Sequence, residues 1–272
     1  MAPFNSLTFL TDYGLEDAFV AVCHGVASQI APDLRIIDIT HQIPLGDIRR
    51  GAVVLAQAAP YFPAAVHVAV VDPGVGTARR AVAVQAGDSV FVGPDNGLLS
   101  FAVAAAGGAA RAVSLTNKAL WLDTTAATFH GRDIFMPVAA HLLTGTALDQ
   151  AGTPIAAGEL VTLSAPTSRM LEGEADGEVL TVDRFGNIQL SIPSAAASEL
   201  GIVIGSCMTI RCNRREITAP YLVTFGAAAP GDLVAFTDSA GLISLAVRSG
   251  SAAEKLSLRP GARVRIAADP GT

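Results

Sequence analysis

The sequence predicts two domains of different class, an α/β domain followed by an all-β domain. In the first half of the chain, apolar β-branched runs alternate with stretches at helical spacing, the order typical of a mainly parallel sheet. From residue 174 onward, short alternating strands separated by Gly and Pro turns indicate a small barrel or sandwich. Between them, residues 152–173 are rich in Pro, Gly, Ser and Thr and lack periodicity, which favours an interdomain connection.

The N-terminal half contains a regular succession of strands and helices. Short apolar runs predict strands at residues 7–12, 34–40 and 66–71. Apolar residues at helical spacing predict helices at residues 17–30, 47–59, 98–106 and within 128–143. Asp47 is expected to be the N-cap of the second helix and Pro60 its terminator. Gly87 and Asp88 predict a hairpin between two short strands.

The C-terminal half predicts strands and few helices. The expected strands are residues 177–182, 187–191, 207–211, 214–217, 233–236, 242–247 and 262–266. We therefore expect an N-terminal domain over residues 1–160, a linker over 161–173 and a C-terminal domain over 174–272.

The composition restricts the classes of partner. Of the 272 residues 51% are hydrophobic and only 15% are charged, which favours an oligomer with buried interfaces. An alanine-rich host genome is the alternative explanation. The net charge of −6 and the lack of a basic stripe argue against nucleic-acid binding.

The cysteines and the N-terminal residues predict that the protein functions in the reducing cytosol. The three cysteines, Cys23, Cys207 and Cys212, form neither a disulfide framework nor a CxxC motif. The first residues lack the pattern of a signal peptide, and no apolar run approaches the roughly 20 residues that span a bilayer.

Two acidic residues follow apolar strands, where open α/β sheets bind ligands. Asp72 ends the run at residues 66–71 and begins a Pro/Gly loop from which Arg79 can return toward it. Alternatively, Asp72 only caps this turn. Asp12 can accept hydrogen bonds from a ribose diol, or it is the N-cap of the following helix.

Two further segments combine polar side chains with glycine. His130 precedes Gly131 at the expected entrance to a helix, beside Arg132 and Asp133, which can pair with each other or cap the helix. In residues 183–187, an acid that can hold an ammonium group lies near an amide, although a hairpin turn explains the same pattern.

Metal and phosphate motifs are not found. The histidines His24, His41, His67, His130 and His141 show no metal-ligand spacing. The glycines at 74 and 76 belong to neither a Walker motif nor a GxGxxG motif, and there is no GxSxG elbow. No metal is therefore expected.

Taken together, six segments resemble one family. They are residues 11–14 (TDYG), 38–41 (DITH), 71–77 (VDPGVGT), 93–97 (GPDNG), 129–133 (FHGRD) and 183–187 (DRFGN). In this order and spacing they resemble the S-adenosyl-L-methionine (SAM) hydroxide adenosyltransferases, adenosine-forming SAM hydrolases related to fluorinase and chlorinase. The resemblance covers nearly the whole chain.

The resemblance implies a fold, an assembly and a reaction. The fold is an α/β N-terminal domain with a mainly parallel sheet plus a C-terminal all-β barrel. The assembly is a cytoplasmic homotrimer, with active sites between the N-terminal domain of one chain and the C-terminal domain of its neighbour. The reaction converts SAM and water to adenosine and L-methionine without a cofactor.

The resemblance also implies catalytic residues. Asp72, Arg79 and His130 would orient and deprotonate the water, and the residues alone leave open whether Asp72 or His130 is the base. Fluorinase-like enzymes carry Tyr in place of Asp72, and Tyr and Ser in place of His130 and Gly131. A carboxylate at 72 should repel halide, which favours hydrolysis.

Substrate-binding residues carry over from the same resemblance. Asp12 corresponds to the ribose-binding acid, and Asp183 and Asn187 to the groups around the methionine ammonium. Phe225 could pack on adenine. Two further positions are Ser239, near the methionine carboxylate, and Val247, at the adenine edge. The adjacent fluorinase Arg is Ala240 here, so that carboxylate could be held by backbone N–H groups.

Two other functions remain open from the sequence. One is a SAM-dependent chlorinase, which Asp72 disfavours. The other is a SAM- or adenosine-binding sensor with vestigial turnover, which the presence of Asp72, Arg79 and His130 disfavours.

Overall fold

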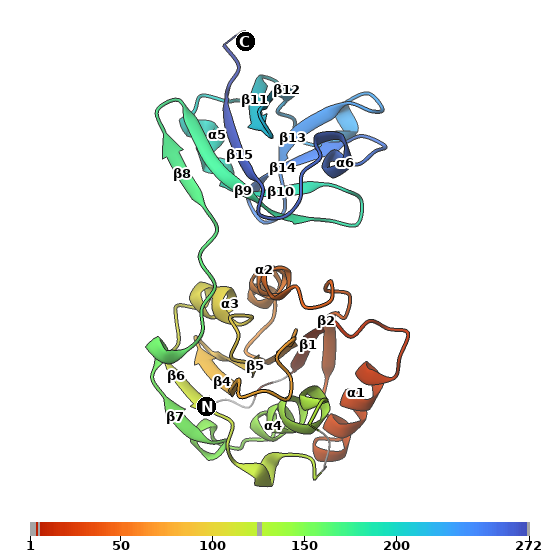
Figure 1. Cartoon of the computed structure of the whole chain (residues 1–272), viewed down its shortest axis with the longest axis vertical. Helices are drawn as coiled ribbons and strands as arrows, with labels where there is room; N and C mark the ends of the chain where they lie inside the picture. Colours follow the sequence, from red (N-terminus) through yellow and green to blue (C-terminus); the bar gives the residue numbers. More distant parts are fainter. Residues whose placement is uncertain (1–3, 5, 124–126, 271–272) are drawn as a thin grey trace. The chain divides into compact units, whose positions relative to one another are not determined.

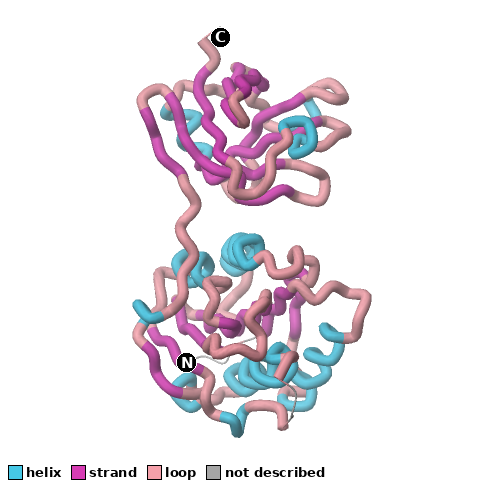
Figure 2. Tube along the Cα trace, viewed as in Figure 1, coloured by secondary structure: helices cyan, strands magenta, loops and turns pink. Residues whose placement is uncertain are grey.

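The chain forms two compact units in the computed structural model, Met1–Ser164 and Ala165–Thr272 (Figure 1). The structure describes Phe4, residues 6–123 and residues 127–270. Figure 2 shows helices around the strands of the first unit and mainly strands in the second. The expectation of an α/β half followed by an all-β half is confirmed.

The centre of the first unit is a seven-stranded sheet. Its strands are β1 (Leu7–Thr11), β2 (Ile36–Thr40), β3 (Val66–Val70), β4 (Ala81–Ala86), β5 (Ser89–Pro94), β6 (Arg111–Ser114) and β7 (Thr153–Ile155). Their spatial order is β2-β1-β3-β5-β4-β6-β7. The pairs β1–β2, β1–β3 and β3–β5 are parallel, and the pairs from β5–β4 outward are antiparallel. The predicted hairpin is confirmed, since Ala86 and Ser89 pair across a two-residue turn.

Helices cover both faces of this sheet (Figure 1). The α-helices are α1 (Phe19–Ile30), α2 (Ile48–Ala58), α3 (Ser100–Ala105) and α4 (Met136–Leu143). The shorter helical turns are η1 (Ala59–Tyr61), η2 (Lys118–Leu120), the π-helical turn η3 (Gly131–Phe135), η4 (Leu148–Gln150) and η5 (Ala157–Glu159). In the described part of the chain, no helix has the length and apolar character to cross a membrane.

The alternation of side chains along the strands explains the two layers of helices. Phe9 of β1 and Val68 of β3 pack with α1 and α4, whereas Leu10 and Ala69, one residue later, pack with α2 and α3. Successive side chains of a strand point to opposite faces, so a strand buried on both faces is apolar throughout. This is why β1 and β3 could be predicted as continuous apolar runs.

Asp47 caps α2, as predicted. Its Oδ1 accepts a hydrogen bond of 2.9 Å from the backbone N–H of Arg50. We expect Asp47→Ala to lower the free energy of unfolding of the first unit by about 1 kcal/mol, and Asp47→Asn to preserve it. Urea unfolding followed by the fluorescence of Trp121, the single tryptophan, measures this unit alone. Equal stability of Asp47→Ala and the parent protein would contradict the capping role.

The second unit is built on one antiparallel sheet. Its strands are β8 (Ser168–Leu171), β9 (Glu174–Val182), β10 (Ile188–Pro193), β11 (Cys207–Cys212), β12 (Arg215–Pro220), β13 (Leu233–Thr237), β14 (Leu242–Val247) and β15 (Arg263–Ala268). Seven of them follow the order β12-β11-β15-β9-β10-β14-β13, and β8 pairs with β9. Tyr221, directly after β12, bridges to Ala235 of β13, so the path nearly closes into the expected barrel.

Three short helical segments complete this unit, namely α5 (Ser194–Glu199), η6 (Phe225–Ala227) and α6 (Ala252–Leu256). The sequence did not predict them. Helical segments of three to six residues are too short to display the apolar spacing of a full helix.

The segment 152–173, interpreted as the interdomain connection, contains the boundary between the two units and two strands that the sequence did not predict. β7 pairs with β6, and β8, within the segment 161–173 expected to be a linker, pairs with β9. All four side chains of β8 are exposed. Such a strand is held by backbone hydrogen bonds and has no buried face, so it has no apolar alternation to predict it.

Candidate active site

The strand order creates a crevice at the carboxyl ends of β1 and β3. From β1 the chain passes through α1 to β2 on one side, and from β2 it passes through α2 to β3 on the other side of β1. Because α1 and α2 lie on opposite faces, β1 and β3 flank a topological switch point, where open α/β sheets bind ligands. Asp12 and Asp72 are the residues that follow at or near these two strand ends.

A cavity of about 750 Å³ opens at this point of the first unit. Its lining includes both acids and an aromatic wall that comes from separate segments. The lining residues are Asp12, Tyr13, Phe19, Leu45, Gly46, Val70, Asp72, Pro73, Val75, Thr128, Phe129, His130, Gly131 and Arg132.

Asp72 is paired with Arg79 on the wall of this cavity. Arg79 Nε lies 3.0 Å from both carboxylate oxygens of Asp72, and Arg79 Nη2 donates to Asp72 Oδ2. The loop that returns Arg79 is closed by a 2.7 Å hydrogen bond from Thr77 Oγ1 to Gly74 O and by Gly76 at φ +78°. The side chain of Asp72 therefore does more than cap its turn. Arg80 pairs with Asp95 instead, at 2.8 Å.

Arg79 also joins Asp72 to His130, which lies 58 residues further along the chain. Arg79 Nη2 lies 2.8 Å from His130 Nδ1. A guanidinium can only donate, so His130 Nδ1 accepts and the ring proton is on Nε2. Burial, followed by the charge of Arg79, lowers the pKa of His130, which agrees with a neutral imidazole.

Asp12 is not an N-cap, so this alternative is wrong. The N-cap of α1 is Ala18, without a side-chain hydrogen bond. Instead, Asp12 Oδ2 accepts a 2.9 Å hydrogen bond from the backbone N–H of Gly46, and both residues line the cavity. The carboxylate is thus held at the cavity wall by a main-chain donor.

Tyr13 is a site residue that sequence reasoning missed. A Cβ on Gly131 would overlap the Tyr13 hydroxyl oxygen and would lie 3.1 Å from Tyr13 Cζ. The Tyr13 ring makes an edge contact with Phe129 at 5.7 Å between centroids. Burial raises the pKa of Tyr13 well above its usual value, so the phenol is neutral. Its position directly after Asp12 was the one available signal.

The neighbouring charged pair is structural. Arg132 Nε donates to Asp133 Oδ1 at 2.5 Å, and Asp133 is buried. The expectation that these two residues pair with each other is confirmed. The guanidinium of Arg132 lies over the ring of Phe129, 5.1 Å from its centroid, and so supports the aromatic wall.

Four of the five substrate-binding residues expected in the C-terminal half line one cavity of the second unit. Asp183, Asn187, Phe225 and Val247 surround a space of about 860 Å³. Ser239 is exposed in the turn between β13 and β14 and is not among the residues lining this cavity.

The carboxylate of Asp183 is occupied by its own turn. Asp183 Oδ1 accepts from the N–H groups of Phe185 and Asn187, at 2.8 and 2.9 Å, and Asp183 Oδ2 accepts from Asn187 Nδ2 at 2.8 Å. Gly186 has φ +83°, as such a turn requires. The hairpin alternative is therefore correct for this segment, and the same turn lines the cavity.

The backbone N–H of Ala240 holds the turn between β13 and β14. The N–H of Ala240 donates to Asp238 Oδ1 at 2.8 Å. Asp238 holds the same turn through the N–H of Leu242 at 3.1 Å. The backbone N–H of Ala240 is thus part of the turn.

Comparisons with known proteins bear on both units. The profile of the SAM hydroxide adenosyltransferase N-terminal domain matches residues 7–152, and that of the C-terminal domain matches residues 177–265. This chain belongs to the SAM hydroxide adenosyltransferase family. The matches follow the two units in order and cover most of the chain.

Relatives of this adenosyltransferase cover nearly its full length. A protein of Salinispora tropica named (R)-S-adenosyl-L-methionine hydrolase is 52% identical over 98% of this chain and 100% of its own. A protein of the same name from Thermus thermophilus is 41% identical over 95% and 98% of the two chains. A fluorinase of Actinopolyspora mzabensis is 27% identical over 96% of each chain.

A crystal structure of a conserved protein from Thermotoga maritima has the same fold as this adenosyltransferase. Its TM-score is 0.90 at 36% identity, and the match covers 96% of this chain and 99% of the other. The fold expected from the resemblance is confirmed.

We expect the rate of SAM hydrolysis to fall only below pH 6.5. Burial and the charge of Arg79 lower the pKa of His130 from 6.5, the ordinary pKa of histidine. Protonation puts a proton on Nδ1 and removes the lone pair that accepts from Arg79. Turnover should therefore persist at pH 6.5 and fall as His130 becomes protonated at lower pH. Rates of SAM consumption against pH, with an NMR titration of His130, measure this.

A variant separates the causes of this shift. In Arg79→Gln the charge is removed while burial remains, so the NMR pKa of His130 should rise toward 6.5. A titration of the parent protein at or above pH 6.5 would contradict the arrangement.

Proposed function

We propose that this adenosyltransferase hydrolyses SAM to adenosine and L-methionine, by in-line attack of an activated water on the ribose 5′ carbon. The observation that carries the proposal is the Asp72–Arg79–His130 cluster at the wall of a cavity on the switch point. The hydrolase names of relatives at 52% and 41% identity support it.

The chemistry requires few groups. A bond forms between the water oxygen and the 5′ carbon while the bond from that carbon to sulfur breaks, and sulfur keeps the electron pair. The sulfonium leaves as a neutral thioether, so no acid has to protonate the leaving group. The water loses one proton. An oriented water and a proton acceptor are the main requirements, and no cofactor takes part.

The hydrogen bonds of the Asp72–Arg79–His130 cluster favour different roles for His130 and Asp72. In neutral His130, Nδ1 is occupied by Arg79 and Nε2 carries the proton, so Nε2 can donate to the water and orient it. Asp72 then accepts the proton, because Oδ1 is approached by Arg79 Nε alone whereas Oδ2 takes both guanidinium donors. We assign Asp72 as the base and His130 as the orienting donor.

The same carboxylate disfavours a chlorinase. The Asp72 side chain is 5% exposed and lines the cavity, so chloride would have to approach a buried negative charge with limited screening by water. A sensor with vestigial turnover is disfavoured because Asp72, Arg79 and His130 are already joined by hydrogen bonds.

The remaining residues are proposed to bind the two ends of SAM. Asp12, anchored by Gly46, would accept hydrogen bonds from the ribose diol. Asn187 and the turn of Asp183 would face the methionine ammonium, with Phe225 on the adenine. Ser239 would lie near the methionine carboxylate, and Val247 would lie at the adenine edge.

We also propose that the active protein is a cytoplasmic homotrimer whose sites combine residues from neighbouring chains. Exposed apolar side chains support an association: Leu45 at the first cavity is 92% exposed, and Phe185 at the second is 70% exposed. The free cysteines Cys23, Cys207 and Cys212 agree with a reducing compartment.

Mixed oligomers test the sharing of sites. Asp72→Asn and Phe225→Ala subunits, each impaired alone when SAM is well below KM, should regain activity at that SAM concentration when refolded together, since some sites then combine two intact halves. Light scattering gives the mass of the assembly. A fully active monomer would contradict the trimer.

Product analysis tests the reaction. The protein is incubated with each sulfonium epimer of SAM, with and without chloride, and products are separated by chromatography. Adenosine and methionine in equal amounts, from the (R) epimer named for the relatives, are expected. 5′-Chloro-5′-deoxyadenosine would support a chlorinase, and unchanged SAM would support a sensor.

Phe225→Ala is expected to raise KM for SAM about tenfold with little change in kcat, because stacking on a base contributes about 1–3 kcal/mol. Phe225 is 46% exposed and makes an edge contact with Phe236, 5.9 Å between centroids, so its loss should cost little stability. Steady-state kinetics with Val223→Ala, an exposed neighbour outside the cavity lining, as control measure this. An unchanged KM would remove Phe225 from the binding site.

A further inference from the structure

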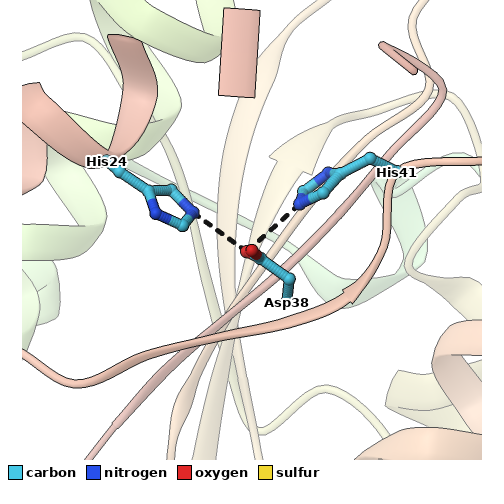
Figure 3. A group of neighbouring side chains, drawn as sticks. All are labelled: His24, Asp38 and His41. Atoms are coloured by element: carbon cyan, nitrogen blue, oxygen red, sulfur yellow. Dashed lines mark hydrogen bonds and ion pairs between the residues drawn. The ribbon is translucent and has the colours of Figure 1, made fainter. Parts of the chain in front are cut away.

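Three side chains outside the lining of the active-site cavity converge on one point of the first unit. His24 comes from α1, Asp38 from β2 and His41 from the residue after β2 that begins the next loop. Figure 3 shows both imidazole rings directed at the same carboxylate oxygen.

The distances are those of potential metal ligands. His24 Nε2 lies 2.9 Å from Asp38 Oδ1, and His41 Nε2 lies 3.1 Å from the same oxygen. All three ligand atoms lie within 4.8 Å of one another. Two imidazoles and one carboxylate form a common donor set for zinc and related divalent ions.

His41 is the most buried of the three side chains, and its Nε2 faces Asp38. The His41 side chain is 2% exposed, and its Nε2 has no hydrogen-bond partner among the described residues although it faces Asp38. A histidine that binds a metal does so as the neutral ring, in which one nitrogen carries a lone pair. A cation between His41 Nε2 and Asp38 Oδ1 would stabilise the tautomer in which Nε2 carries this lone pair.

The other nitrogen of His41 has the partner that a metal ligand needs. His41 Nδ1 lies 2.9 Å from Thr11 Oγ1, and the same hydroxyl accepts from the N–H of Tyr13 at 3.1 Å. A ring that donates from Nδ1 to Thr11 presents unprotonated Nε2 toward Asp38 and His24. Metal-binding histidines are usually held by such a second hydrogen bond.

We propose that His24, Asp38 and His41 bind one Zn²⁺ ion per chain, with water as the fourth ligand. His24 and Asp38 are 33% and 40% exposed, which gives the ion a path and leaves room for the water. Tetrahedral zinc places its ligand atoms about 3.3 Å apart, so the two contacts with Asp38 Oδ1, of 2.9 and 3.1 Å, have to widen by a few tenths of an ångström.

This inference changes the expectation from the sequence, in which the histidines show no metal spacing. His24 precedes Asp38 by 14 residues, and only the packing of α1 beside β2 brings them together. The ion would fix the turn at Thr11, which precedes Asp12 and Tyr13, and we expect it to stabilise the fold. The site is independent of the proposed reaction, in which no metal takes part.

Metal titration of the intact protein tests the proposal. Protein freed of metal with a chelator is titrated with ZnCl₂ in a calorimeter, and with CoCl₂ while the visible spectrum is recorded. One ion per chain, a four-coordinate Co²⁺ spectrum and a Tm raised by Zn²⁺ are expected. His24→Gln and Asp38→Asn, both at partly exposed positions, should weaken binding more than tenfold, on the order of the loss from a disturbed metal shell.

Two control variants show whether Zn²⁺ binding depends on the proposed ligands. His141→Gln on α4 should bind Zn²⁺ like the parent protein, and so should Cys23→Ser, which removes the thiol next to His24. The proposal is overturned if the parent binds no Zn²⁺, if His24→Gln binds as tightly as the parent, or if Cys23→Ser abolishes binding. Product assays on the metal-free protein are separate, so a failed hydrolysis assay would not affect this result.

Discussion

Asp72→Asn is expected to lower kcat for SAM hydrolysis by about 100- to 10,000-fold, the range for loss of a general base. An amide can still accept a hydrogen bond from Arg79, so the loop and His130 should stay in place. What is lost is the group that takes the proton from water. The measurement is single-turnover adenosine formation at saturating SAM.

Two controls accompany the Asp72 result. Asp88→Asn, exposed in the turn between β4 and β5, removes the same charge away from the cavity and should leave kcat unchanged. Unfolding followed by Trp121 fluorescence shows whether Asp72→Asn is folded. If folded Asp72→Asn forms adenosine at the parental rate, Asp72 is not the base.

Gly131→Ala is expected to lower kcat/KM at least tenfold, although the change adds only one methyl group. That methyl would overlap the Tyr13 hydroxyl, so the phenol or the π-helical turn has to move. His130 precedes this turn directly, and a displacement of about 1 Å can cost about 100-fold in rate. Steady-state kinetics of adenosine formation measure the loss.

A double variant identifies the cause. Tyr13→Phe removes the hydroxyl oxygen and leaves the nearest ring carbon 3.1 Å from the new methyl, a contact that small shifts can relieve. Tyr13→Phe/Gly131→Ala should therefore recover most of the activity relative to Gly131→Ala. If the double variant is as impaired as Gly131→Ala, steric conflict with Tyr13 is not the reason.

The sequence was most informative where a local pattern has a single structural cause. β1 and β3 were predicted as strands because both of their faces are buried, and Asp72 was noticed because it interrupts an apolar run. Arg79 was expected to return toward Asp72 from the Pro/Gly loop, and the structure shows that the adjacent Arg80 is held by Asp95 instead.

Features that depend on contacts between distant segments could not be predicted. The N–H of Gly46 reaches Asp12 from 34 residues away, and β8 joins its sheet by backbone hydrogen bonds alone. The grouping of His24 with Asp38 requires the packing of a helix against an edge strand. None of these contacts leaves a periodicity or motif in the chain.

The order β2-β1-β3 has a consequence for how such proteins diversify. The crevice exists because the connections diverge at β1, and it does not depend on which side chains line it. Selection can therefore exchange the few groups at the strand ends while the scaffold keeps the same opening. A protein named fluorinase aligns over 96% of this chain at 27% identity. Such a relative is expected if the scaffold is inherited while the reacting side chains are replaced.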